Sequence, residues 1–225
     1  MKKWIKIPLV IIGVLLTLWF IGKAARTFTL MTMSADANFP TLKYGDKFFI
    51  SKLVKPRRFR LISYVSNTEY FGKQIWVHRL CGLEGDTIEI RNGDLYINGQ
   101  YSDKELGLAH PYKIPRAELP AVEQLHTLNE ISTYTIGSDT IVTNLSDALV
   151  RRNQLKVFRV VLPASHRDND IEKIFKQPWN ADHFGPLVIP KGKYFLLGDN
   201  RNNSMDSRYI GFIDKSDFVA TVLWK

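Results

Sequence analysis

The feature that most constrains this chain is an uncharged apolar stretch near its start. Residues 7–21 read IPLVIIGVLLTLWFI, and Trp4, Ile5 and Gly22 extend the stretch if the Lys6 side chain reaches toward lipid headgroups. At about 1.5 Å per residue, ~19 helical residues cover roughly 28 Å, close to the hydrocarbon thickness of a bilayer. We therefore expect residues 1–27 to form an N-terminal transmembrane helix that anchors the protein in the lipid bilayer.

A secretory signal peptide that is removed is the alternative, because the stretch is short and its start is basic. Against this alternative, the small residues Ala24 and Ala25 lie between the charges of Lys23 and Arg26, which leaves no good cleavage site. Three lysines precede the stretch and two cations follow it. This bias predicts a single-pass protein of the cell membrane, with a cytoplasmic amino terminus and the bulk of the chain on the outer (periplasmic or extracellular) face.

Composition excludes several classes of protein. Of the 225 residues, 45% are hydrophobic and 24% charged, which is typical of a globular chain. Residues 1–30 hold five Lys and Arg and no acid, so they carry five of the nine net positive charges, and the rest of the chain is only mildly basic. The basic run at residues 55–60 is more typical of a solvated strand edge or a membrane-facing loop than of a nucleic-acid site. We expect no nucleic-acid partner.

Neither a metal nor another cofactor is indicated. Cys81 is the single cysteine, so it cannot form an internal disulfide, and the usual Cys or His spacings of a zinc site are missing from the sequence.

Short β segments fill residues 45–100 and return after Pro186. They are rich in β-branched and aromatic residues and are separated by Gly, Asp and Asn. The turn Asn92-Gly93-Asp94 indicates a hairpin, because glycine adopts positive φ without steric cost. The expected strands are Lys47–Ile50, Leu61–Val65, Ile75–Leu80, Thr87–Arg91, Leu95–Asn98, Leu187–Ile189, Tyr194–Leu197 and Phe218–Leu223.

The segment between these two groups of strands differs in character. Residues 116–130 and 146–152 are predicted to be helical, the second with Ser146 as N-cap. We therefore expect a mainly β, antiparallel sheet or barrel-like core formed by residues 28–101 and 186–225. Residues 102–185 are expected to form an inserted α/β subdomain.

The most distinctive string in the chain follows the predicted strand Tyr194–Leu197. A turn so dense in Asp, Asn and Ser can hold itself rigid through hydrogen bonds from side chain to backbone. Asp206 and Arg208 can form a charge-assisted pair on one side of a cleft. Taken alone, a well-bonded structural loop explains the string, which is Gly198-Asp199-Asn200-Arg201-Asn202-Asn203-Ser204-Met205-Asp206-Ser207-Arg208.

This string resembles the Gly-Asp-Asn-Arg-x-x-Ser-x-Asp-Ser-Arg signature of the type I signal peptidases at all eight specified positions. The segment from Arg79 to Asp86 is similar to a second family motif, and Pro40-Thr41-Leu42 with Gly45-Asp46 is similar to a third. The chain is therefore identified as a divergent member of that family. The resemblance implies a membrane-anchored serine endopeptidase with an antiparallel β fold that cleaves the signal peptides of exported preproteins.

Two positions depart from the chemistry that the resemblance implies, which is a serine nucleophile with a lysine base. Counting back three residues from Pro40 places Ala37 at the nucleophile position, and a methyl group cannot attack a carbonyl. Asn38 and Ala35 also differ from the family pattern, so the whole segment has diverged. His78 stands at the base position, as in signal peptidases of the endoplasmic-reticulum and archaeal type. A histidine needs less tuning than an amine to act as a base near neutral pH, although a half-buried structural histidine is the alternative.

Ser34 is the nearest serine that could replace the missing nucleophile, and Thr32 is a poorer candidate. An ordinary loop serine is the alternative for Ser34. Asp36 could instead pair with His78 and hold it charged, which would weaken it as a base. The resemblance implies that Ser204 bonds the base and that the other signature residues shape the site, namely Asp199, Asn200, Arg201, Asp206 and Arg208.

A further departure lies at Arg58-Phe59-Arg60, where the family usually has Arg-Gly-Asp, so the local turn is in question. Three functions therefore remain open. The first is a signal peptidase acting through His78 and an unconventional serine. The second, which the residues favour, is a non-catalytic relative that binds signal peptides as an added strand. The third is an unrelated exported β-domain that binds a partner.

Overall fold

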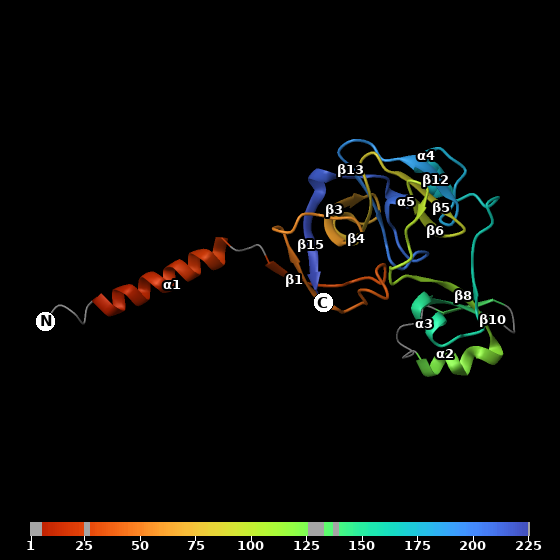
Figure 1. Ribbon diagram of the computed structural model, residues 1–225, viewed down its shortest axis with the longest axis horizontal. Coiled ribbons are helices and arrows are strands. Elements are labelled where there is room, and N and C mark those ends of the chain that lie inside the picture. The colour runs from red at the N-terminus through yellow and green to blue at the C-terminus, as the bar shows by residue number, and fades with distance from the viewer. Residues whose placement is uncertain (1–5, 25–27, 126–132, 137–139, 225) are drawn as a thin grey trace.

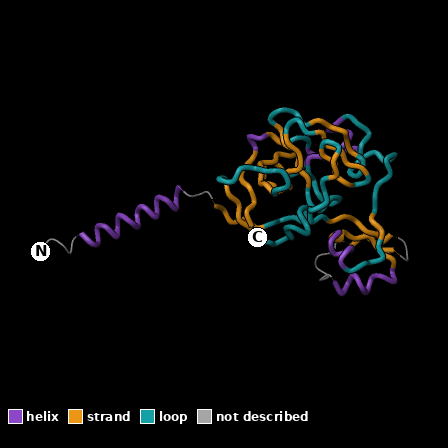
Figure 2. The backbone as a smooth tube through the Cα atoms, viewed as in Figure 1, coloured by secondary structure: helices purple, strands orange, loops and turns teal. Residues whose placement is uncertain are grey.

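The computed structural model describes residues 6–24, 28–125, 133–136 and 140–224. The described chain is mainly antiparallel β, which confirms the expected fold class. Figure 1 shows most strands in one larger body, a smaller lobe beside it that holds residues of the predicted insertion, and helix α1 (Lys6–Ala24) extending away from the larger body. Figure 2 shows how little of that body is helical.

The apolar side chains along the middle of helix α1 are not buried in a hydrophobic core. Leu15 is 59% exposed and Trp19 is 52% exposed. Among the helices whose residues the structure describes, none is both long and apolar enough to cross a membrane. The predicted transmembrane helix is therefore not supported by the structure. Residues 1–5 and 25–27 of the predicted anchor lie outside the described residues.

The largest sheet has seven strands in the order β1-β2-β15-β3-β4-β13-β14, and every pair in it is antiparallel. Burial alternates over the first four residues of β2, where Phe48 and Ile50 are buried and Lys47 and Phe49 exposed, whereas β13 is buried over four consecutive residues. The strands are β1 (Phe28–Thr32), β2 (Lys47–Ser51), β3 (Leu61–Thr68), β4 (Gly72–Leu83), β13 (Lys193–Leu197), β14 (Ile213–Asp214) and β15 (Phe218–Trp224).

A second sheet has the order β12-β5-β6-β7. Its hairpin turn forms where the sequence predicts it, with φ of 52° at Asn92 and 79° at Gly93. Two positive φ values at the turn match the twist of the flanking strands. The strands are β5 (Thr87–Arg91), β6 (Asp94–Ile97), β7 (Gln100–Tyr101) and β12 (Phe184–Val188).

A third sheet, in the order β11-β8-β10-β9, lies within the predicted insertion. Its strands are β8 (Ala109–Pro115), β9 (Thr133–Ile136), β10 (Thr140–Ser146) and β11 (Phe158–Arg159). Two short helices accompany it, α2 (Leu119–Leu125) after a 3₁₀ turn at Arg116–Glu118, and α3 (Asp147–Arg152). The helix predicted for residues 116–130 is thus shorter than expected within the described part, and residues 126–130 lie outside it. Ser146 is the N-cap of α3 but makes no side-chain cap bond.

The main hydrophobic cluster joins the first two sheets. It combines Cys81 of β4, Ile88 of β5 and Phe195 of β13 with Ile171 of helix α4 (Asn169–Phe175) and Phe184 of β12. The boundary at residue 185 stays a prediction, and the pairing of β12 with β5 lies across it.

The predicted insertion is also bound to the signature loop, which comprises residues 198–208, by backbone hydrogen bonds and a buried ion pair. The Ala109 amide donates to the Asp199 carbonyl, and the Arg201 amide donates to the Ala109 carbonyl. The Arg201 guanidinium pairs with the Asp103 carboxylate at 2.6 and 2.8 Å, and both side chains are 3% exposed. The loop is thereby fixed from the side of the third sheet.

The substitution Asp103→Ala removes one partner of this pair and leaves the Arg201 charge buried. Breaking a buried pair in this way costs about 3–5 kcal/mol, so the free energy of unfolding should fall by that amount in urea titrations. The matched control is Asp214→Ala, which removes the more exposed pair with Lys193 and should cost at most about 1 kcal/mol. Equal losses in the two variants would contradict the role given to the buried pair.

Candidate functional site

The imidazole of His78 lies at the centre of the site. Strand β4 carries it opposite Ile62 of β3, and only 4% of the residue is exposed. Both ring nitrogens have partners: Nδ1 lies 2.9 Å from the Tyr64 hydroxyl, and Nε2 lies 3.2 Å from Ser204 Oγ. The resemblance implied a bond between Ser204 and the base position, and these two side chains are within hydrogen-bond distance here.

The surroundings of His78 favour the neutral ring. The pKa of His78 is lowered to about 4, mainly by burial; the carboxylates of Asp206 and Asp199 act in the opposite direction, and the Arg208 charge adds a smaller lowering effect. Desolvation is the largest of these effects, because it penalises the charged imidazolium. At neutral pH the ring therefore carries one proton, on either Nδ1 or Nε2.

The loop that carries Ala37 is held against β4 and against the signature loop. The Asn38 side chain donates from Nδ2 to the carbonyl of Val77, the neighbour of His78, at 2.6 Å. On the other side, the Asn200 amide donates to the Ala37 carbonyl at 3.0 Å, and Asn200 Nδ2 donates to the Asp36 carbonyl at 3.1 Å. Ala37 is thus fixed between the strand of His78 and the loop of Ser204.

Gly198 makes this close approach possible. A Cβ atom at this position would lie 2.5 Å from the Ala37 carbonyl oxygen and 2.2 Å from Ser204 Oγ. Only glycine leaves room for the two segments to meet at this distance. Close packing of these two segments therefore explains why a glycine stands at the first position of the signature string.

Two buried ion pairs hold the signature loop in shape. Asp199 accepts two hydrogen bonds from the Arg79 guanidinium, at 2.6 and 2.5 Å. The predicted pair of Asp206 and Arg208 forms at 2.8 Å, with both side chains at most 1% exposed. Arg208 also donates to the carbonyls of Arg201 and Ala181, so its charge is fully surrounded by acceptors.

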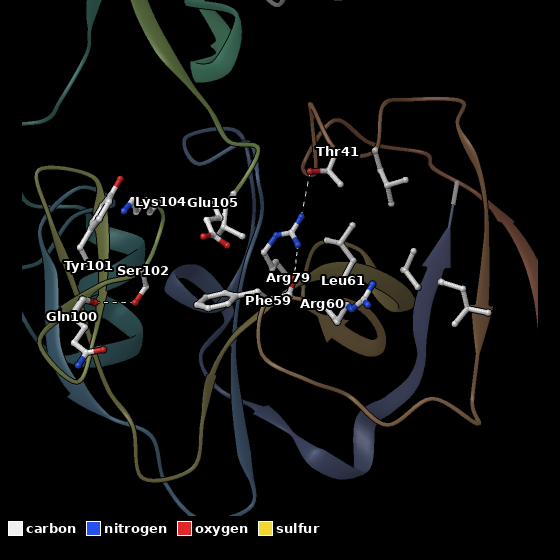
Figure 3. A pocket seen from close by; sticks show the side chains of 14 residues that line it. Thr41, Phe59, Arg60, Leu61, Arg79, Gln100, Tyr101, Ser102, Lys104 and Glu105 are labelled. Carbon is white, nitrogen blue, oxygen red and sulfur yellow. Dashed lines mark hydrogen bonds between the residues drawn. The ribbon is translucent and has the colours of Figure 1, made fainter. Parts of the chain in front are cut away.

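The Arg79 guanidinium also closes one side of a hollow of about 690 Å³, which Figure 3 shows from close by. It donates there to the Phe59 carbonyl at 2.5 Å and to Thr41 Oγ1 at 3.3 Å. Phe59 adopts φ of 65°, a left-handed conformation that favours glycine. Phe59 thus stands where the family usually has glycine and still adopts the left-handed backbone that a glycine would allow.

A separate groove of about 520 Å³ contains Ala37 and His78, the positions that the resemblance matches to the nucleophile and the base. It is lined by the 31–37 segment, by β4 residues 74–78 and by residues 203–205 of the signature loop. Its walls combine polar side chains with exposed apolar ones, among them Phe71, Ile75 and Met205 at 52%, 49% and 38% exposure. The loop after α1 and the signature loop therefore do share one groove, as the resemblance requires.

One edge of β4 is open along this groove. β3 pairs with β4 from Gly72 onward, whereas β13 pairs with it only from Arg79. Within the described strands, residues 72–76 therefore have a neighbour on one side only. Backbone N–H and C=O groups on such an edge are available to an added strand.

The structure brings some predicted residues together and leaves others apart. Ser34 lines the groove but is exposed, and no hydrogen bond joins it to His78 in the described part of the chain. The carboxylate of Asp36 accepts from the Tyr44 amide at 3.3 Å rather than pairing with the ring. The roles of Ser34, Ala37 and Ser204 in chemistry stay predictions.

The sequence patterns do not indicate two residues that contact His78 or its neighbour in the structure. Tyr64 bonds the ring of His78, and Asn38 bonds the carbonyl of Val77. Tyr64 lies in a predicted strand two residues beyond the partner of His78, so the strand register would have revealed it. The described residues contain no group of three or more His, Cys, Asp or Glu suited to hold a metal ion.

Comparison with known proteins agrees with the geometry. The family model for signal peptidase, peptidase S26, matches residues 1–225, so the chain belongs to this family. Signal peptidase I P of Bacillus subtilis subsp. natto is 28% identical over 183 residues, which cover 80% of this chain and 67% of that protein. Signal peptidase I of Bacillus licheniformis is 27% identical over 221 residues, or 97% of this chain and 84% of that protein.

A crystal structure of a signal peptidase I from Enterococcus faecalis V583 is also similar. It is 24% identical, covers 76% of this chain and 98% of its own, and superposes with a TM-score of 0.37.

The burial of neutral His78 predicts a pH-dependent contribution to stability. The ordinary pKa of 6.5 applies to the unfolded chain, and the folded value is about 4. Between these values the unfolded state binds the extra proton, so stability is complete above pH 6.5 and falls as the pH drops toward 4. The full loss is about 3 kcal/mol.

Urea unfolding at pH 7 and pH 4 should show this additional loss in the wild type relative to His78→Gln. Parallel pH profiles for the two proteins would contradict it.

Proposed function

We propose that this protein binds the signal peptides of exported preproteins in the groove beside His78 without cleaving them. The observation that carries the proposal is a groove with an open strand edge in which Ala37 occupies the position matched to the family's nucleophile. The names of the relatives support the ligand, since they are signal peptidases.

The open edge favours an extended peptide as the ligand. Residues 72–76 of β4 offer backbone donors and acceptors, and residues 74–76 line the groove together with the 33–37 loop. A peptide that adds a strand gains affinity from main-chain hydrogen bonds and selectivity from pockets for alternate side chains. The exposed apolar side chains of Ile75, Phe71 and Met205 suit an apolar peptide.

The surroundings of the ring disfavour cleavage. A general base must take the proton of a nucleophile within hydrogen-bond reach, and Nε2 of His78 faces Ser204 rather than Ser34. The lowered pKa of His78 also makes the ring a weak base near neutral pH. Cleavage through Ser34 is the second candidate function, supported by its place in the same groove.

Attachment to the lipid bilayer through α1 is part of the same proposal, with the body of the protein on the outer face of the cell membrane. It is supported by the exposed apolar side chains of α1, such as Ile11, Leu15 and Trp19. Exposed aliphatic and aromatic side chains along one helix gain free energy by leaving water.

The experiment combines a binding and a cleavage measurement on the full chain in detergent micelles. A fluorescent signal peptide should bind with saturation, while an exported preprotein should remain intact over hours. Signal peptidase I of Bacillus licheniformis, assayed in parallel, is the positive control for cleavage. A signal peptide with two aspartates in its apolar segment should bind at least tenfold more weakly, because the apolar side chains of the groove cannot pair the charges.

A product band from the wild type that disappears in Ser34→Ala and in His78→Ala would overturn the proposal and establish the second candidate. Absence of saturable peptide binding would overturn it as well. Ser102→Ala is a matched control for Ser34→Ala, since Ser102 lies outside this groove.

A further inference from the structure

Tyr64, His78 and Ser204 form a chain of hydrogen bonds in which each proton has a definable place. The Tyr64 hydroxyl lies 2.9 Å from Nδ1 of His78, and Nε2 of the same ring lies 3.2 Å from Ser204 Oγ. A neutral imidazole has one N–H donor and one acceptor nitrogen. If Nδ1 accepts from Tyr64, Nε2 must donate to Ser204, and if Nδ1 donates, Nε2 must accept from Ser204.

Burial distinguishes these two arrangements. Tyr64 is 0% exposed, and His78 Nδ1 is its one hydrogen-bond partner within the described residues. Burial also raises the pKa of Tyr64, so its hydroxyl keeps the proton. That buried proton needs an acceptor, and Nδ1 supplies one only when the ring proton is on Nε2. In the opposite tautomer, the Tyr64 hydroxyl proton would point at no acceptor.

Ser204 can satisfy either arrangement, because it is half-buried and lines the groove. Its hydroxyl can donate to Nε2 or into the groove, whereas the fully buried Tyr64 has no such choice. The side chain that is enclosed therefore determines the direction of all three hydrogen bonds.

We propose that Tyr64 is a positioning residue that holds His78 in the Nε2–H tautomer, so that the ring donates to Ser204 Oγ and the Ser204 hydroxyl donates to a carbonyl of a peptide in the groove. The inference rests on the proposed function for the peptide, but the tautomer itself is a property of the free protein. The position matched to the family's base thereby acts as a hydrogen-bond donor, and Ser204 becomes a contact for the peptide backbone.

Nuclear magnetic resonance of the full chain in micelles, with ¹⁵N and ¹³C in the histidine rings, tests the tautomer without a ligand. The His78 signals are assigned by their loss in His78→Gln. We expect one neutral tautomer at pH 7, protonated on Nε2. In Tyr64→Phe, Nδ1 loses its donor, so the signals should shift toward the Nδ1–H form or a mixture of both.

The matched control is Tyr194→Phe, which removes the hydroxyl of another buried tyrosine in the same hydrophobic cluster as Tyr64. No hydrogen bond involves the Tyr194 hydroxyl among the described residues, so the His78 signals should stay unchanged. Thermal unfolding of both variants separates loss of the tautomer from loss of the fold.

Peptide binding then tests the link to the ligand. We expect the dissociation constant of the signal peptide to rise about fivefold in Tyr64→Phe and in Ser204→Ala, as for the loss of one hydrogen bond, and to stay constant in Tyr194→Phe. An Nδ1–H ring in the wild type, or unchanged His78 signals in Tyr64→Phe, would overturn the inference. An Nε2–H ring in a protein that binds no signal peptide would overturn the proposed function and the peptide contact while leaving the role of Tyr64 intact.

Discussion

The buried pair of Arg79 and Asp199 is the interaction on which the site depends. It joins two side chains that are 120 residues apart in sequence, one on β4 and one in the signature loop. Arg79 follows His78 directly, and Asp199 precedes Asn200, whose amide binds the Ala37 carbonyl. One bidentate contact thus sets the distance between the histidine strand, the loop of Ala37 and the loop of Ser204.

Two adjacent residues of β4 line two hollows with different surroundings. The guanidinium of Arg79 faces the larger hollow beside Phe59 and Thr41, whereas the preceding side chain, His78, faces the groove. Successive residues of a strand point to opposite faces, so the pair and the ring do not compete for space. In the described part of the chain, the ring nitrogens bond only Tyr64 and Ser204, and Trp76 packs against the ring, so burial outweighs the carboxylates of Asp206 and Asp199 in setting its pKa.

Sequence patterns predict the strands of this protein well, because the residues within each strand and the turns that flank it determine where the strand forms. Runs rich in β-branched and aromatic residues locate β2 through β6, and Asn92-Gly93 locates a turn whose positive φ values only glycine and a few polar residues adopt readily. The signature string predicts the Asp206–Arg208 pair for the same reason, since its partners are two residues apart. Phe59 is an instructive exception, because its left-handed backbone is imposed by contacts with Leu80 and Arg79 rather than by its own preference.

The parts of the site that cannot be predicted from the sequence depend on strand register and on contacts between residues far apart in the chain. That Tyr64 meets His78 follows from the offset of β3 against β4, which neither strand specifies alone. The bond from Asn38 to the Val77 carbonyl likewise joins segments 39 residues apart. The family motifs indicate which segments meet. The hydrogen-bond partners of the two ring nitrogens decide whether His78 accepts or donates a proton, and only the three-dimensional structure identifies these partners.

The proposed function requires that a peptide adds a strand along the open edge of β4. Amide hydrogen exchange of residues 72–76, measured with and without a saturating signal peptide, tests it most directly. We expect slower exchange at alternate amides of this segment, with little change at the exposed Asn92 in the turn between β5 and β6. Exchange that stays the same along residues 72–76 while the peptide is bound would contradict it.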